Sequence, residues 1–109
     1  MRCFSFLLMI ILLINARLCW AEIQSVTIRI SNHIFLPAEI HVPANTKMKL
    51  SIINEDDTAE EFESGDLNRE KIIPGNHKTT IFIGPLAPGE YSFFGEFNPK
   101  TAQGILVVK

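Results

Sequence analysis

The C-terminal stretch Tyr91-Ser-Phe-Phe-Gly-Glu-Phe-Asn-Pro-Lys-Thr-Ala-Gln-Gly-Ile-Leu-Val-Val108 contains two apolar runs on either side of a polar loop. The runs Tyr91 to Phe94 and Ile105 to Val108 are made largely of aromatic and aliphatic residues, many of them β-branched, which favour strands. The segment between the runs is rich in Gly, Pro and Asn, which mark turns and loops. This pattern predicts a strand–loop–strand corner.

Earlier segments of the chain repeat the strand pattern. Ser25 to Ile30, Lys47 to Ile53 and Lys78 to Ile83 alternate apolar and polar residues, as half-buried strands do. Glu39 to Val42 forms a further short strand after a bend marked by Pro37. Six or seven short strands separated by Pro/Gly turns predict an all-β sandwich. We expect four aromatic side chains in its core: Phe62, Phe82, Phe93 and Phe94.

The first 21 residues have the features of a secretory signal peptide. A basic start leads into an apolar run from Phe4 to Ile14, which is too short to span a bilayer, since a spanning helix needs about 20 residues. We expect cleavage after Ala21, which leaves residues 22–109 as a single exported domain in the periplasm without a membrane segment. A lipid anchor on Cys19 is the alternative.

Removal of the signal changes both the thiol content and the charge. Cys3 and Cys19 leave with it, so the exported chain has no disulfide, no Cys nucleophile and no thiolate metal ligand. Arg2 and Arg17 leave as well, which moves the net charge from −2 to −4. An acidic domain of this kind is a poor partner for nucleic acid or anionic lipid.

The acidic residues are concentrated between Asn54 and Lys71. Eight of the twelve lie there: Glu55, Asp56, Asp57, Glu60, Glu61, Glu63, Asp66 and Glu70. One interpretation is a solvated connection whose charges oppose pairing at a sheet edge. Within it, residues 66–71 fit one helical turn that ends at Pro74. We expect surface ion pairs among Asp66, Arg69, Glu70 and Lys71.

Three motifs give the chain a resemblance to the cupredoxins, the small copper-carrying β-sandwiches. They are F-x-P-x-x-I-x-V-P-A-x-T-x-x-x-L-x-I-x-N from Phe35 to Asn54, L-x-P-G-E-Y-x-F from Leu86 to Phe93, and the C-terminal frame Y-x-F-F-x-x-x-x-P…G-x-L-V-V. The resemblance implies a Greek-key β-sandwich of about seven strands. Asn45 stands where the family commonly has Gly, and Asn also tolerates the left-handed turn conformation.

Two longer motifs indicate a narrower branch of the family. Glu60 to Lys71 reads E-E-F-E-S-x-D-L-N-R-E-K, and Phe93 to Gly104 reads F-F-G-E-F-x-P-x-T-A-Q-G. They resemble small exported proteins that are similar to the cupredoxin part of bacterial iron-uptake proteins. The resemblance implies handling of iron or copper outside the inner membrane, with a membrane metal-transport protein as a partner.

The copper ligands that the resemblance implies are missing. Glu60 stands in the place of the first His, Gly95 of the Cys, Asn98 of the second His, and Ala102 or Gln103 of the Met. A blue-copper site needs two imidazoles, a thiolate and a weak axial ligand. We therefore expect no blue-copper centre and no electron transfer of that kind.

Another metal site at the same end is the working hypothesis. Strand alternation turns Glu60, Phe62 and Ser64 inward, and a partly desolvated carboxylate needs a cation or hydrogen-bond donors. The candidate metal ligands are His33, Glu60 and Glu96, with Glu61, Glu63 and Asp66 as a second ring. Nitrogen and carboxylate ligands suit Zn(II), Cu(II), Mn(II) or iron. Alternatively, His33 donates to Glu60 or to the backbone, and no metal is needed.

The sequence contains none of the common catalytic motifs, such as Gly-x-Ser-x-Gly, a phosphate loop or His-Glu-x-x-His. We therefore do not expect an enzyme. The sequence instead predicts a periplasmic metal-binding or metal-transport accessory protein for iron or copper. The alternative is a metal-free β-sandwich that binds another protein through its acidic face, residues 55–66.

Overall fold

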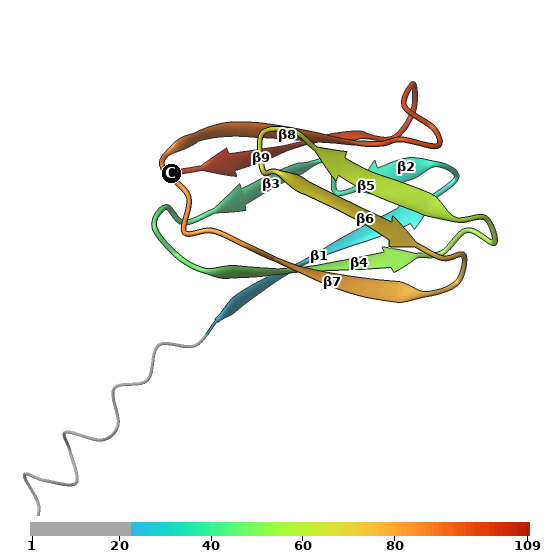
Figure 1. The fold of residues 1–109 in the computed structure, drawn as a ribbon, viewed down its shortest axis with the longest axis horizontal. Coiled ribbons are helices and arrows are strands. Elements are labelled where there is room, and N and C mark those ends of the chain that lie inside the picture. The colour runs from blue at the N-terminus through green and yellow to red at the C-terminus, as the bar shows by residue number, and fades with distance from the viewer. Residues whose placement is uncertain (1–22) are drawn as a thin grey trace, which may run out of the picture.

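The computed structural model describes residues 23–109, which form two β-sheets packed face to face (Figure 1). The nine strands are β1 (Gln24–Ser31), β2 (Ile34–Leu36), β3 (Glu39–Val42), β4 (Met48–Asn54), β5 (Glu60–Ser64), β6 (Arg69–Ile73), β7 (Lys78–Ile83), β8 (Gly89–Gly95) and β9 (Gln103–Val108). No helix occurs in this part of the chain. The predicted all-β sandwich is confirmed.

The sheets are mixed, and the chain passes repeatedly between them. The first sheet has the strand order β2-β1-β4-β7 and the second has the order β3-β9-β8-β5-β6. β1 pairs in parallel with β4, β3 pairs in parallel with β9, and the other neighbours are antiparallel. The predicted C-terminal corner is the antiparallel pair β8–β9.

The core lies between the sheets because the strands alternate as the sequence predicts. Ile28 and Ile30 of β1 are buried with Leu50 and Ile52 of β4. Three aromatic rings join the two sheets: Phe35 of β2 lies edge-on to Phe62 of β5 and Phe93 of β8, with ring centroids 6.3 and 5.3 Å away. Asn45 has a φ of 55°, the predicted left-handed conformation.

Three local expectations were wrong. Phe82 is 49% exposed, on the outer face of edge strand β7, with Lys47 Nζ 5.5 Å from its ring centroid. Phe94, also expected in the core, is only half-buried. The expected helical turn at residues 66–71 is a turn followed by β6. Four of the five residues of β6 are exposed, so this edge strand shows no alternation that would reveal it.

The predicted signal peptide, residues 1–21, and the alternative anchor at Cys19 lie outside the described residues. The β-sandwich accounts for the rest of the predicted domain from Ile23 onward. Across residues 23–109 there is no helix of the length and apolarity that crossing a membrane requires.

Candidate functional site

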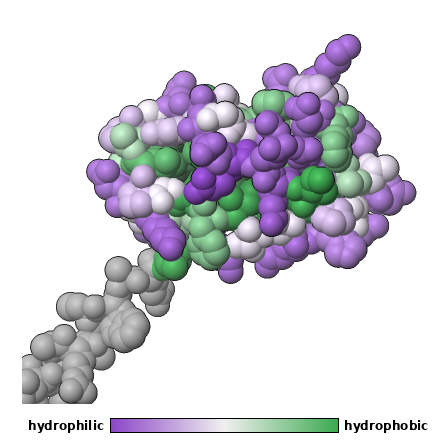
Figure 2. All heavy atoms as spheres, in the orientation of Figure 1, coloured by the Kyte–Doolittle hydropathy of each residue, from purple (hydrophilic) through white to green (hydrophobic). Residues whose placement is uncertain are grey.

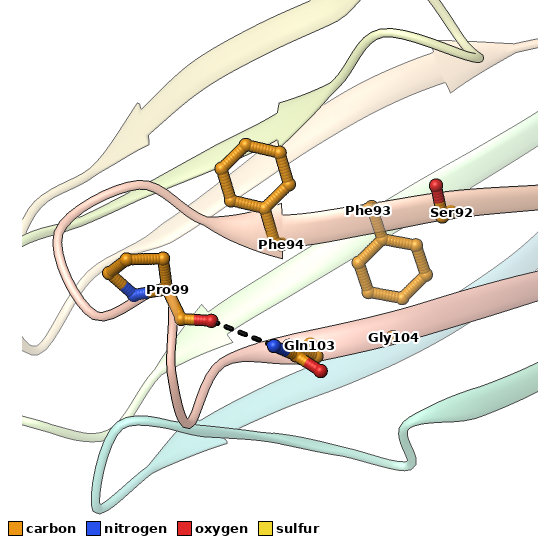
Figure 3. A pocket seen from close by; sticks show the side chains of 6 residues that line it. All are labelled: Ser92, Phe93, Phe94, Pro99, Gln103 and Gly104. Atoms are coloured by element: carbon orange, nitrogen blue, oxygen red, sulfur yellow. Dashed lines mark hydrogen bonds between the residues drawn. The ribbon is translucent and has the colours of Figure 1, made fainter.

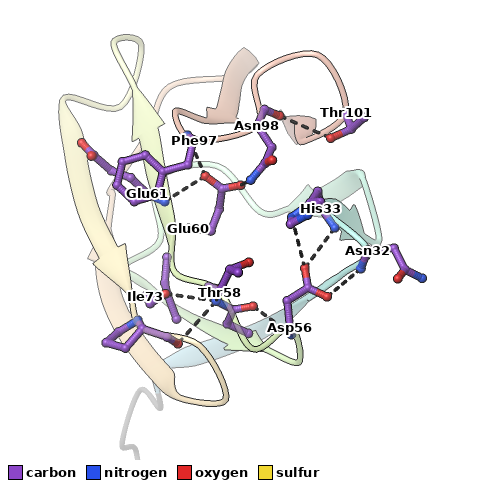
Figure 4. Close-up of polar contacts among 12 residues, drawn as sticks. Asn32, His33, Asp56, Thr58, Glu60, Glu61, Ile73, Phe97, Asn98 and Thr101 are labelled. Carbon is purple, nitrogen blue, oxygen red and sulfur yellow. Dashed lines mark hydrogen bonds and ion pairs between the residues drawn. The ribbon is translucent and has the colours of Figure 1, made fainter.

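The start of β5 and the loop after β8 meet at one end of the sandwich (Figure 4). The backbone N–H of Glu96 donates to the carbonyl oxygen of Glu61 at 2.9 Å, which extends the β5–β8 pairing into the loop. The backbone N–H of Phe97 donates to the Glu60 side chain at 2.9 Å. The connections from residues 54–64 and 95–103 therefore share one pole.

Glu60 is buried at this pole, with 1% of its surface exposed. Its Oε1 accepts hydrogen bonds from the backbone N–H groups of Glu61 and Phe97, both at 2.9 Å. Its Oε2 accepts a hydrogen bond from Asn98 Nδ2 at 2.8 Å. A buried carboxylate is costly unless donors surround it, and these three bonds supply them.

Gly95 and Ala102 pack against the Glu60 carboxyl group. A Cβ atom at position 95 would lie 2.6 Å from Glu60 Cδ and 2.7 Å from the Cβ of Ala102, closer than real Cβ contacts allow. Ala102 is fully buried. The space into which a side chain at position 95 would extend is therefore filled by Glu60.

His33 has a different carboxylate partner, Asp56 (Figure 4). Asn32 and His33 form the tight turn between β1 and β2, with φ values of 52° and 61°, as a two-residue hairpin turn requires. Asp56 accepts the backbone N–H groups of both residues at 2.8 and 3.0 Å, and its Oδ2 lies 3.6 Å from His33 Nδ1. The pairing of His33 with Glu60 that we considered is not what the structure shows.

Glu96, the third predicted ligand at this pole, is exposed, and its backbone N–H donates to the carbonyl oxygen of Glu61. His33, Glu60 and Glu96 thus come from the β1–β2 turn, the start of β5 and the loop after β8. They do not form a group of three ligand atoms within 4.8 Å of one another; among residues 23–109 that property belongs to Glu61, Glu63 and Glu70.

These three glutamates, which we call the carboxylate cluster, lie on the face of the β5–β6 hairpin that points away from the core. Glu63 and Glu70 are directly opposite each other in the antiparallel ladder, and Glu61 is two residues before Glu63 on the same face. Glu61 borders an open hollow of about 420 Å³ with Glu70, Lys71 and Ile72. Figure 2 shows that hydrophilic residues predominate over the middle of the visible face.

The carboxylate cluster raises the pKa of Glu61 from the usual 4.5 to about 7. A hydrogen bond with Glu70 is the largest cause, followed by partial burial and the negative charges of Glu70 and Glu63. Such a bond requires one of two neighbouring carboxyl groups to keep its proton. The cluster therefore holds a proton below about pH 7, and a cation could take the place of that proton.

Asp66, the remaining predicted ligand, is separate from the carboxylate cluster. Its Oδ2 accepts hydrogen bonds from the backbone N–H of Ser92 at 2.9 Å and from Ser92 Oγ at 3.0 Å, and these bonds lower the pKa of Asp66. Arg69 donates to the carbonyl oxygens of Leu67, Asn68 and Phe82. Asp66 and Arg69 thus bond to Ser92 and to backbone carbonyl groups, and not in the surface ion pairs that we expected.

Glu70 is the residue that sequence reasoning missed. We assigned it to a helical turn and to surface ion pairs, but β6 places it beside Glu63. A hairpin turn predicted at residues 65–68 would have paired the two glutamates. The signal for it is Asn68, a residue type that tolerates the left-handed conformation and that has a φ of 54° in the structure.

A smaller hollow of about 270 Å³ lies against β8 and β9, lined by Ser92, Phe93, Phe94, Pro99, Gln103 and Gly104 (Figure 3). Phe93 and Phe94 point to opposite sides of their strand; Phe93 is buried and Phe94 is half-buried. Gln103 Nε2 donates to the carbonyl oxygen of Pro99 at 3.0 Å, which closes the loop on itself. No ionisable side chain lines this hollow.

Comparison with known proteins agrees with the fold. Residues 3–108 match the family model of the cupredoxin-like domain, and the chain belongs to that family. The uncharacterized protein RP394 of Rickettsia prowazekii (strain Madrid E) is 49% identical over 87 residues, which are 80% of this chain and 70% of that protein.

Solved cupredoxins have the same fold at low sequence identity. Auracyanin A, a blue copper protein from Chloroflexus aurantiacus, matches with a TM-score of 0.69 at 14% identity, over 81% of this chain and all of that one. The metal-binding domain of the Cu(I)-exporting P-type ATPase CopA from Streptococcus pneumoniae D39 matches with a TM-score of 0.69 at 16% identity, over 84% and 90% of the two chains.

The residues at the loop pole do not fit a blue-copper ion. The positions that the resemblance assigns to its ligands hold Glu60, Gly95, Asn98 and Ala102 or Gln103, which offer no sulfur and no imidazole. Gly95 has no room for a thiol beside Glu60. Asn98 points its amide N–H at the carboxylate, which is the orientation of a donor and not of a metal ligand.

Proposed function

We propose that this protein is an exported metal-handling protein that binds a hard cation through the carboxylate cluster, and not copper through sulfur and imidazole. The observation that carries the proposal is the convergence of three carboxylate oxygens, from Glu61, Glu63 and Glu70, within 4.8 Å. Within residues 23–109, none of the three forms an ion pair with a Lys or Arg. A cation on the cluster would relieve the repulsion among them.

The donor set favours a particular class of ion. Carboxylate oxygens suit iron, Mn(II), Mg(II) and Ca(II), whereas Cu(I) prefers sulfur. The ligands must be ionised to bind, so a cation would release the proton that Glu61 holds up to about pH 7. Of the two metals that the family resemblance implies, iron fits this cluster better than copper.

The accessory role extends the same proposal. The metal-binding domain of a Cu(I)-exporting ATPase has this fold, which supports a cupredoxin domain acting beside a membrane transport protein. In the proposed role the protein is exported to the periplasm and passes its ion to a membrane metal-transport protein. A cluster on the outer face of the sheet suits such transfer because a partner can approach the ion from solvent.

Calorimetric titration of the exported protein with Mn(II), an oxygen-seeking ion that is stable in air, tests the proposal. Replacing Glu61, Glu63 or Glu70 by Gln should each weaken binding about tenfold or more, because each removes one anionic ligand. Glu39→Gln is the matched control, since Glu39 lies on β3, at the opposite edge of the same sheet. Equal binding by wild type, cluster variants and control would contradict the proposal.

A second candidate is the metal-free interaction module. It is favoured by the loop pole, where Glu60 is satisfied by three donors without an ion. In this case the outward face of β5 and β6 binds a basic segment of another protein. The titration separates the two, since the module would bind Mn(II) no more tightly than the Glu61→Gln variant does.

A further inference from the structure

We infer that Glu60 acts as an internal clamp. Its carboxylate lies where the family resemblance places copper and holds the 95–103 loop by hydrogen bonds, so the loop keeps its conformation without an ion. The inference concerns a different residue and a different face from the carboxylate cluster. The clamp does not require the proposed metal function.

Hydrogen bonds hold the loop both to itself and to Glu60. The loop is bonded internally, with Gly95 N–H donating to Ala102 O at 2.8 Å and Ala102 N–H donating to Asn98 O at 2.9 Å. Two further donors of the loop, the backbone N–H of Phe97 and the side-chain amide of Asn98, both go to Glu60. Glu60 therefore connects the loop tip to β5.

Gly95 and Ala102 leave little space around the Glu60 carboxylate. Glu60 Oε1 and Cδ lie 2.8 and 2.6 Å from where a Cβ at position 95 would be, and Ala102 closes the other side. The Glu60 residue is 1% exposed. The clamp and a ligand side chain at position 95 thus exclude each other, and Gly95 is the residue that the clamp requires.

The direction of the hydrogen bond between Asn98 and Glu60 also argues against an ion. A metal ligand presents lone pairs to the ion, but Asn98 presents N–H to Glu60 at 2.8 Å. A cation at Oε2 would have to displace that donor. Hydrogen bonds to an ionised carboxylate are among the stronger ones in proteins, so the donor competes well.

Reversing the polarity of the pair tests the clamp. Asn98→Asp alone puts two carboxylates face to face. Combining it with Glu60→Gln lets the new amide at position 60 donate to the new carboxylate at position 98, while the amide oxygen still accepts from Phe97. The measurement is amide hydrogen exchange of Phe97 by NMR in the presence of EDTA. The amide of Ile52, a fully buried residue of β4, reports global unfolding.

We expect Asn98→Asp to speed exchange at Phe97 by about ten- to hundredfold relative to Ile52, the range for losing one hydrogen bond to a charged group. The double variant should recover most of the protection. If Asn98→Asp destabilises the whole domain, the double variant should also restore the exchange rate of Ile52. Unchanged protection in Asn98→Asp, or no recovery in the double variant, would overturn the inference.

An ion at this pole would give a different result. Wild-type protein in EDTA should keep the protection of Phe97, and one equivalent of Cu(II) or Zn(II) should not change it. Loss of protection in EDTA, restored by either ion, would also overturn the clamp. Binding at Glu61, Glu63 and Glu70 affects neither outcome, so failure here leaves the proposed function untouched.

Discussion

Glu60 and Glu61 are adjacent identical side chains with opposite surroundings. Strand alternation sends Glu60 inward to three donors and Glu61 outward to two like charges, as the period of a strand predicts. The sequence could therefore predict which way each carboxylate points. The partners could not be predicted, because Asn98 and Glu70 reach them only through tertiary and hairpin pairing. The pairing of His33 with Asp56 could likewise not be predicted, since Asp56 lies 23 residues further along the chain.

The raised pKa of Glu61 predicts a pH dependence of stability. Between the usual value of 4.5 and about 7, folded Glu61 keeps a proton that the unfolded chain has released. The folded state then binds more protons, so the free energy of unfolding decreases as the pH rises through this window. Glu61→Gln should remove this decrease and be more stable than the wild type above pH 7.

Urea unfolding of both proteins, without added metal, at pH 4 and pH 8 measures this effect. The difference in the free energy of unfolding between variant and wild type should grow in favour of the variant from pH 4 to pH 8. A difference that is the same at both pH values would show that Glu61 does not share a proton with its neighbours.

At the scale of elements, the β5–β6 hairpin is what sequence reasoning placed least well. The acidic residues of 66–71 suggested a solvated turn of helix, and edge strand β6 buries only Ile73. What fixes the hairpin is contact with β8, which is remote in sequence. Ser64 Oγ donates to Ser92 O at 2.7 Å and accepts the Leu67 N–H at 3.0 Å.

Ser64 is therefore the residue whose loss should loosen the hairpin. It is 2% exposed, and Ser64→Ala leaves the Leu67 N–H without its acceptor. We expect a loss of about 1–3 kcal/mol in the free energy of unfolding, measured by urea denaturation. Ser25→Ala, on β1 in the other sheet and exposed, is the control and should change stability by less than about 0.5 kcal/mol. Equal losses in the two variants would contradict this role for Ser64.

At the scale of the molecule, the two-layer architecture was predictable because six of the nine strands carry a clear pattern: β1, β3, β4, β7, β8 and β9. Of the three rings that join the sheets, Phe62 and Phe93 were expected in the core, whereas Phe35, on the short strand β2, was not. Phe82 was assigned to the core because aromatic residues are usually buried, but it alternates with the buried Ile81 and Ile83 and lies on the outer face of the sheet. The shared pole of the two loops was also predicted, whereas the ligand set at it depended on side-chain packing.

The most direct test of the central claim is a crystal structure of the exported protein soaked in Mn(II), with the ion located by its anomalous scattering. We expect an anomalous peak bounded by Glu61, Glu63 and Glu70, and none beside Glu60 and Asn98, where the carboxylate–amide hydrogen bond should persist. A peak at the loop pole, bound by Glu60 together with His33 or Glu96, would contradict it.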